Sequence, residues 1–246
     1  MRFAIQLVGL LIGLPLHLLI IAAMLRGGYK RFPLVFVYTI VDFLTTVMES
    51  MPAINYFRGV PESGMAELYW RIEVVMQVLV YAVVLSLIYE ATARLASRRA
   101  VRTLVVVGAL LVAIISLAVH YSPSLTRGEW MTPWTRDLNF SSVILDLGLW
   151  MMLIGQRKKD QRLLMLSGAL GIEFTGDAIG ASLRQLAQRN HSRSISFTGG
   201  TLGMLADLTF LFIWWQTFRT DKAAVPAADR VGREGELRSP ESRARS

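Results

Sequence analysis

The chain has 246 residues, of which 53% are apolar and only 18% are charged, and its mean hydropathy is +0.45. Charged residues normally make up about a quarter of a soluble domain, so we expect most of this surface to face lipid. The formal charge of +8 would favour nucleic acid as a partner of a soluble protein, but here the basic residues gather between apolar stretches, which indicates membrane topology and no nucleic-acid partner. Cysteine is absent, which excludes disulfides, thiolate nucleophiles and cysteine-ligated metals.

Seven apolar stretches are long enough to cross a bilayer, whose hydrocarbon core needs about 20 helical residues. Their approximate bounds are 3–25, 33–54, 69–93, 101–121, 138–154, 163–183 and 197–218. The first stretch is followed by basic residues, and no clear small-residue cleavage site closes it. We therefore interpret it as a retained helix and not as a signal peptide. The sequence therefore predicts an all-α integral membrane bundle of seven transmembrane helices.

The basic residues between the stretches predict the orientation. Eleven lie in the loops on one side and eight on the other, and the segment 219–246 adds seven to the first side. The positive-inside rule then places the N-terminus outside and the C-terminus in the cytoplasm of a bacterial inner membrane. The segment 219–246 has almost no large apolar residue, so we expect a disordered cytoplasmic tail. It is expected to be solvated, or alternatively to bind anionic lipid or a protein partner on the cytoplasmic side.

Acidic side chains inside the apolar stretches are the main functional signal, because each is costly in hydrocarbon and usually faces a cavity, a partner or a pathway. Four lie near the midplane and others in the outer half, and at steps of three or four residues they share faces with further polar side chains. The resulting candidate set for an intramembrane polar cavity is Asp42, Glu49, Glu73, Gln77, Tyr81, Asp146, Glu173, Asp177 and Asp207. Arg71 and Arg184, near the outer ends, are the evident basic residues to pair with these acids.

Such a cavity is expected to open to the outside and to be acidic. Carboxylates this close cannot all stay ionised, so the cavity should hold protons or a cation. The alternative is that the acids act as neutral links between helices. Our first hypothesis is a sensor or binding protein, and the second is a small proton- or cation-coupled transporter using Asp42, Asp146, Glu173 and Asp207. We expect no cofactor and leave a metal ion and the oligomeric state open.

Other chemistries fit the residues less well. The four lysines all lie in predicted loops or the tail, which excludes a retinal Schiff base. His17 and His120 are predicted about 20 Å apart in depth, too far to share a haem. Thr175-Gly176-Asp177 with Asp207 on the next helix faintly resembles paired-aspartate intramembrane proteases, which leaves an intramembrane hydrolase as a third hypothesis.

Two segments carry a family resemblance. Arg31–Tyr38 reads RFPLVFVY, and Tyr69–Glu73 reads YWRIE, followed by Tyr89-Glu90. These segments resemble a family of uncharacterised, acidobacterial-type seven-helix inner-membrane proteins. The resemblance implies the same architecture and an unassigned function, and it carries no catalytic residue onto this chain. Glu73 and Glu90 are the functional candidates among its positions.

Overall fold

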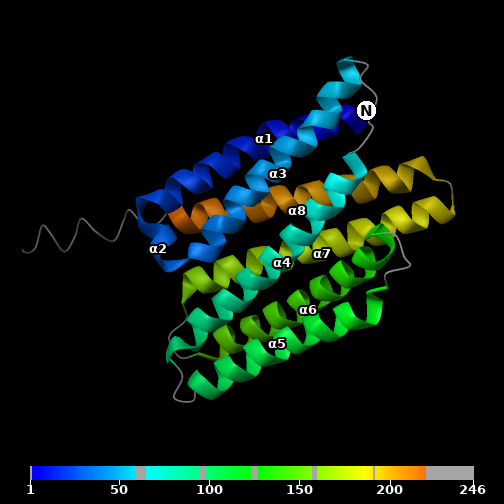
Figure 1. The fold of residues 1–246 in the computed structure, drawn as a ribbon. Helices are drawn as coiled ribbons and strands as arrows, with labels where there is room; N and C mark the ends of the chain where they lie inside the picture. Colours follow the sequence, from blue (N-terminus) through cyan, green and yellow to red (C-terminus); the bar gives the residue numbers. More distant parts are fainter. Residues whose placement is uncertain are drawn as a thin grey trace, which may run out of the picture.

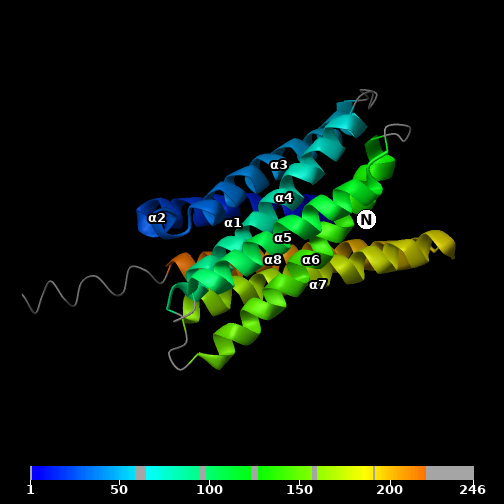
Figure 2. The ribbon, with the colours of Figure 1, turned by 60° about the horizontal axis from the view of Figure 1, so that its bottom comes forward.

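The chain folds into a bundle of long helices that run along a common direction (Figures 1 and 2). The computed structural model describes residues 2–58, 65–94, 98–122, 127–156, 160–190 and 192–219, and this part of the chain is helical without any strand. The long helices are α1 (Arg2–Ala23), α3 (Pro33–Arg58), α4 (Met65–Ala91), α5 (Arg98–His120), α6 (Arg127–Gly155), α7 (Gln161–Arg189) and α8 (Arg193–Arg219). The predicted tail lies outside the described residues.

Six helices in the described part of the chain are long and apolar enough to cross a membrane. Their apolar spans are Leu7–Arg31, Arg71–Ala91, Arg99–His120, Trp130–Gly155, Gln161–Ala187 and Ser194–Arg219. The remaining predicted stretch, 33–54, corresponds to α3, whose span Pro33–Met48 forms a shorter apolar helix within the described side chains. The part of the chain that the structure describes is thus all-helical, with six helices that are both long and apolar enough to cross a membrane.

Several helices extend beyond the apolar stretches that predicted them. Helix α6 begins at Arg127 rather than near residue 138, and it contains Pro133 in its first turns. Helix α7 begins at Gln161 because Asp160 caps it by accepting a hydrogen bond from the Leu163 amide, and it continues to Arg189. Hydropathy alone marks only the part of each helix that fits hydrocarbon, so these polar helical turns were predicted as loops.

Six of the helices close a ring. Helix α1 packs on α3 and α8, α3 packs on α4, α4 on α6, α6 on α7, and α7 on α8. Helix α5 lies outside the ring against α6 and α4. The main apolar core fills one end of the ring and includes the fully buried side chains of Ile20, Met24, Leu87, Leu166 and Trp214.

Helices α7 and α8 form a tight antiparallel pair through glycine. A Cβ atom added at Gly180 would lie 2.8 Å from the carbonyl oxygen of Gly199, and one added at Gly199 would lie 2.8 Å from that of Gly180. A Cβ at Gly176 would collide with the side chain of Ala206. The pair therefore forms a closely packed wall, and the side chains that flank these glycines face the ring or the outer surface.

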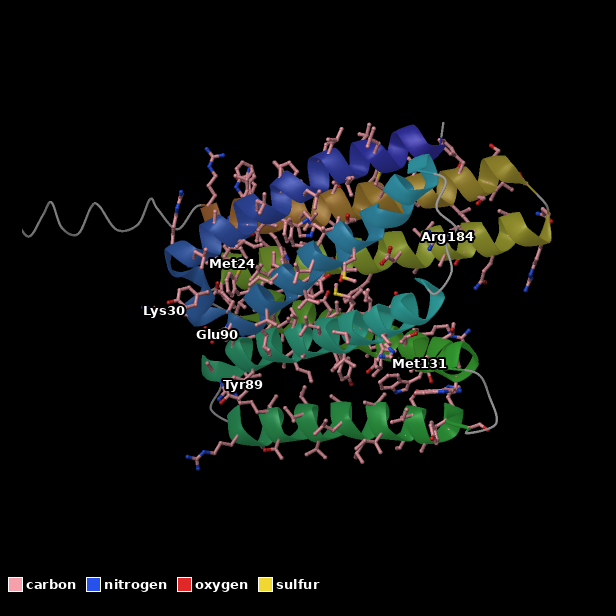
Figure 3. The ribbon with its side chains drawn as sticks, turned by 45° about the horizontal axis from the view of Figure 1, so that its top comes forward. Met24, Lys30, Tyr89, Glu90, Met131 and Arg184 are labelled. Atoms are coloured by element: carbon pink, nitrogen blue, oxygen red, sulfur yellow. The ribbon has the colours of Figure 1, made fainter. Side chains whose placement is uncertain are left out.

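A short reversal connects α1 to α3. The π-helical turn η1 (Met24–Gly28) leads into the single turn α2 (Tyr29–Arg31), and Gly27 has a φ of 139°, which other residues adopt only with strain. This bend turns the chain back at the end of the bundle where Met24, Lys30 and Glu90 lie, while Met131 and Arg184 lie at the opposite end (Figure 3).

Candidate functional site

Polar side chains from four helices meet inside the ring. We call them the central polar cluster: His17 from α1, Tyr38 and Asp42 from α3, Glu173 from α7 and Asp207 from α8. Three of these are carboxylic acids that the sequence predicted to share a cavity. The cluster lies next to the apolar core, since Tyr38 belongs to both.

The contact between His17 and Asp42 holds a proton. The His17 ring is 2% exposed; its Nδ1 lies 2.8 Å from the Gly13 carbonyl oxygen and its Nε2 lies 2.9 Å from Asp42 Oδ2. A carbonyl only accepts hydrogen bonds, so Nδ1 carries a proton, and Nε2 of a neutral ring is then an acceptor. The second contact is a hydrogen bond only when a further proton sits on Nε2 or on the carboxyl group. The pair is therefore a proton-binding unit of zero net charge.

Tyr38 links α3 to α7 and α8. Its hydroxyl group donates to Glu173 Oε1 at 3.2 Å, and its ring packs edge-on against Phe210 and Trp214. Trp214 in turn donates from Nε1 to the Leu166 carbonyl oxygen at 3.3 Å, which fixes the orientation of the aromatic wall. Tyr38 is thus a rigid donor, positioned by packing on both sides.

Glu173 has one oxygen without a hydrogen bond. Its Oε2 is buried and has no partner within the described residues, and the same holds for Nε2 of Gln77 on α4. Buried polar atoms are almost always hydrogen-bonded, so each of these atoms indicates a place for a proton, water or ligand. The carboxyl groups of Asp207, Asp42 and Asp177 all interact electrostatically with Glu173. The cluster therefore concentrates acidic oxygens around an unsatisfied acceptor.

A second polar group lies between the central polar cluster and the end of the bundle marked by Arg184. Asp177, one turn beyond Glu173 on α7, interacts electrostatically with Arg184 and with Glu73 of α4. A Cβ added at Gly203 would lie 3.7 Å from Asp177 Oδ1 and 4.0 Å from Arg184 Nη1, so both side chains lie over that glycine. A chain of acids thus continues from Glu173 toward the predicted outer side.

The remaining predicted site residues lie elsewhere. Asp146 of α6 accepts a 2.6 Å hydrogen bond from Ser167 and borders a separate groove. Tyr81 donates to the Ala109 carbonyl oxygen at 2.9 Å, in a second small core between α4, α5 and α6. The side chain of Glu49 lies outside the described residues. The structure therefore divides the predicted single cavity into a central cluster and at least two other sites.

The two acids of the intramembrane-hydrolase hypothesis lie on neighbouring helices but have different partners. Asp177 interacts with Arg184, whereas Asp207 interacts with His17 and Tyr38. No group of three acidic or histidine side chains in the described residues is close enough to hold a metal ion.

At the opposite end of the bundle, one arginine connects three segments. Arg31 forms ion pairs of 3.0 Å with Glu90 at the end of α4 and with Asp160 before α7. Burial by itself would raise the pKa of Asp160, but hydrogen bonds from Arg31 and the Leu163 amide outweigh it and hold the pKa below its usual range. Glu90, a candidate from the family resemblance, therefore takes part in an interaction that joins helix ends.

His17 is the member of the central polar cluster that the sequence analysis does not include among its candidates. The sequence signal for it is the depth that it shares with Asp42 in two consecutive predicted helices. The structure also contains a comparable pair outside the cluster, in which Asp137 Oδ2 lies 3.0 Å from His120 Nε2 and accepts a 2.8 Å hydrogen bond from Ser116. Because it lies between α5 and α6, this second pair offers a matched control.

Comparison of the chain with protein-family models, with curated proteins and with solved structures finds no match, so the residues and geometry above carry the functional argument.

Proposed function

We propose that this chain is a bacterial inner-membrane protein that binds a small cation, in the first place a proton, at the central polar cluster and acts as a sensor. The observation that carries the proposal is the buried, unpartnered Oε2 of Glu173 among the carboxyl groups of Asp42 and Asp207. Burying several acids together is costly unless protons or cations compensate them. The cluster is therefore built to respond to a positively charged ligand.

The path of acids supports access from outside. Asp177 interacts electrostatically with Glu73 and with Arg184. Arg184 lies at the end of the bundle that the positive-inside rule assigns to the outer face (Figure 3). In the proposed architecture α3 also crosses the membrane and brings the number of spans to seven. The N-terminus is outside, and the C-terminal tail is cytoplasmic. A protein partner on the cytoplasmic side would read out the state of the cluster.

Proton- or cation-coupled transport is the second candidate. The His17–Asp42 pair favours it, because a histidine and an acid that share a proton on two different helices are the usual components of a proton relay. A transporter requires the site to open alternately to both sides, whereas a sensor requires only binding. The two functions therefore differ in flux and not in the ligand.

The test uses the full-length protein in proteoliposomes, with a pH-sensitive dye inside. Proton and monovalent-cation flux is compared for the wild type, an Asp42→Asn, Glu173→Gln double variant, and the control Asp137→Asn, which removes an acid from the pair outside the cluster. Difference infrared spectroscopy of the protonated-carboxyl band on the same samples reports proton binding without flux. Thermal unfolding confirms that each variant is folded.

Proton binding that is lost only in the double variant, without flux in any sample, would support the sensor. Flux lost in the double variant and kept in Asp137→Asn would support the transporter. If proton binding is the same in all three proteins, the central polar cluster is a structural link between helices and the proposal fails.

A further inference from the structure

A large groove runs along the outer surface of α7 and is separate from the central polar cluster. It has a volume of about 1020 Å³, and α6 and α8 form its sides. Most of its lining is aliphatic, and several of its side chains are exposed on the surface of the bundle, among them Leu147, Ile172, Ile179 and Leu205. In a membrane this surface faces lipid, so the groove is open to molecules dissolved in the bilayer.

Two polar groups lie on the floor of this groove. Asp146 and Trp150 are one turn apart on α6, and both reach over glycines of α7. A Cβ added at Gly171 would lie 3.5 Å from Asp146 Oδ2, and a Cβ added at Gly168 would lie 3.4 Å from Trp150 Nε1. The absence of side chains at the two glycines thus leaves both polar atoms facing the groove.

These atoms have unused hydrogen-bonding capacity. Asp146 is only 4% exposed, and Ser167 binds its Oδ1 at 2.6 Å. Neither Asp146 Oδ2 nor the Trp150 N–H group has a hydrogen-bond partner among the described residues. The groove therefore presents one acceptor and one donor, and the Cβ positions of the two underlying glycines are about 5–6 Å apart, the usual spacing of side chains one turn apart.

The chemistry of the two atoms selects the ligand. An ammonium group has no lone pair for the Trp150 N–H, and a ketone or ester has no proton for an ionised Asp146. A hydroxyl group donates and accepts at once, and its neutral charge makes it far less costly to bury in hydrocarbon than an amine. A hydroxyl group placed between the two side chains would donate to Asp146 Oδ2 and accept from Trp150 Nε1.

The depth of the site narrows the ligand further. Asp146 lies nine residues before the end of the span Trp130–Gly155, which is about 14 Å of helix. The headgroup of a phospholipid stays at the interface and does not reach this depth. The occupant must therefore be a hydrophobic molecule whose hydroxyl group can enter the bilayer core.

We propose that the groove over α7 binds a membrane-dissolved lipid alcohol, with its hydroxyl group between Asp146 and Trp150 and its hydrocarbon body along α7 and α8. This site shares no residue with the central polar cluster, so the proposal for the groove does not depend on the proposed sensor function.

The experiment measures photolabelling of the full-length protein in phosphatidylcholine nanodiscs. The probe is a diazirine-bearing geranylgeraniol, competed by unlabelled geranylgeraniol or by the same hydrocarbon without its hydroxyl group. We expect labels on α6–α8 peptides and at least fivefold weaker competition by the hydrocarbon, as two lost hydrogen bonds require.

Three variants test the geometry. Gly171→Ala covers Asp146 Oδ2 with a methyl group at ordinary contact distance, so we expect normal folding and at least fivefold weaker labelling. Gly148→Ala on α6, where a Cβ meets no atom within 4 Å, is the matched control and should label like the wild type. Trp150→Phe keeps an aromatic side chain and removes the donor, and it tests the proposal if Gly171→Ala fails to fold. Equal competition by alcohol and hydrocarbon, or unchanged labelling of Gly171→Ala and Trp150→Phe, would overturn the proposal.

Discussion

Tyr38 shows how one hydroxyl group acts in the central polar cluster. Its ring is held by Phe210 and Trp214, so replacement by phenylalanine should keep the packing and remove only the donor to Glu173. Glu173 would then lack a hydrogen-bond partner on both oxygens among the described residues. The cluster therefore depends on a single donor for the one hydrogen bond that Glu173 makes there.

We expect Tyr38→Phe to lower the free energy of unfolding by about 1–3 kcal/mol, because a buried acceptor loses its partner. The change should also alter proton binding measured by difference infrared spectroscopy. Tyr81→Phe is the control, since Tyr81 donates to a backbone carbonyl group outside the cluster. It should cost a similar stability and leave proton binding unchanged; an equal effect of both variants on proton binding would contradict the assignment.

The candidate acids were accessible to sequence reasoning, but their grouping was not. Asp42, Glu173 and Asp207 stand out because each interrupts an apolar stretch. Helix periodicity gives the face of each residue on its own helix, but not the neighbour that this face meets. Asp146 was assigned to the same cavity for that reason, whereas the structure places it on the other side of α7, against Ser167.

At the scale of the elements, the contact between α7 and α8 limits what the bundle can change. The backbones approach closely at Gly180 and Gly199, where an added Cβ meets a carbonyl oxygen that no side-chain rotation can move. The small residues 199–203 are evident in the sequence, but the sequence does not indicate that Gly180 is their partner. That pairing depends on the register of two helices, which hydropathy does not encode.

Gly180→Ala should therefore destabilise the protein by about 1–3 kcal/mol, as overpacking of a close interface does. Gly200→Ala is the control, because a Cβ there meets no atom within 4 Å. Thermal unfolding in detergent distinguishes the two variants. Equal melting temperatures would show that the two helices can separate without cost.

The ends of α4 and α7 depend on charge. The pKa of Asp160 is held below its usual range in the folded protein. The ionised carboxyl group therefore stabilises the fold fully at any pH above the ordinary aspartate pKa of about 3.9. This stabilisation is lost as the pH falls through the lower pKa of the folded state. The side chain of Arg31 is 37% exposed and that of Asp160 is 14% exposed, so solvent screening limits the contribution of this ion pair to about 1 kcal/mol.

Melting temperature measured between pH 7 and pH 3 checks this effect. Asp160→Asn should be less stable than the wild type at pH 7, and the difference should shrink below about pH 4, where the wild type loses the same interaction. Because asparagine can keep the N-cap hydrogen bond, a difference that does not change with pH would contradict the assignment to the Arg31 ion pair.

At the scale of the whole molecule, apolar length predicted the long helices but not all of their ends. The described part of the chain contains seven long helices, of which six have spans long and apolar enough for a membrane. Residues 127–137 and 184–189 were predicted as loops because they are polar, yet they continue α6 and α7. Seven crossings remain a prediction from the apolar stretches, and the direction of insertion remains a prediction from basic-residue counts.

Reporter fusions test these predictions in a bacterial host. Alkaline phosphatase, active only outside the cytoplasm, should be inactive after residue 219 and active when fused in the loop between α7 and α8, after Asn190. A fluorescent protein that folds only in the cytoplasm should give the opposite pattern. Activity of alkaline phosphatase at residue 219 would reverse the orientation or remove one crossing.

The close approach of α7 and α8 also bears on ancestry. An acid can be exchanged for another acid and still carry a proton, but at Gly180 and Gly199 every other amino acid brings a Cβ into a backbone oxygen. Divergent sequences that keep this fold should therefore lose the identities of their acids sooner than these two glycines and the spacing between them. A search for distant relatives is best guided by that glycine spacing, together with the glycine at position 27 that reverses the chain.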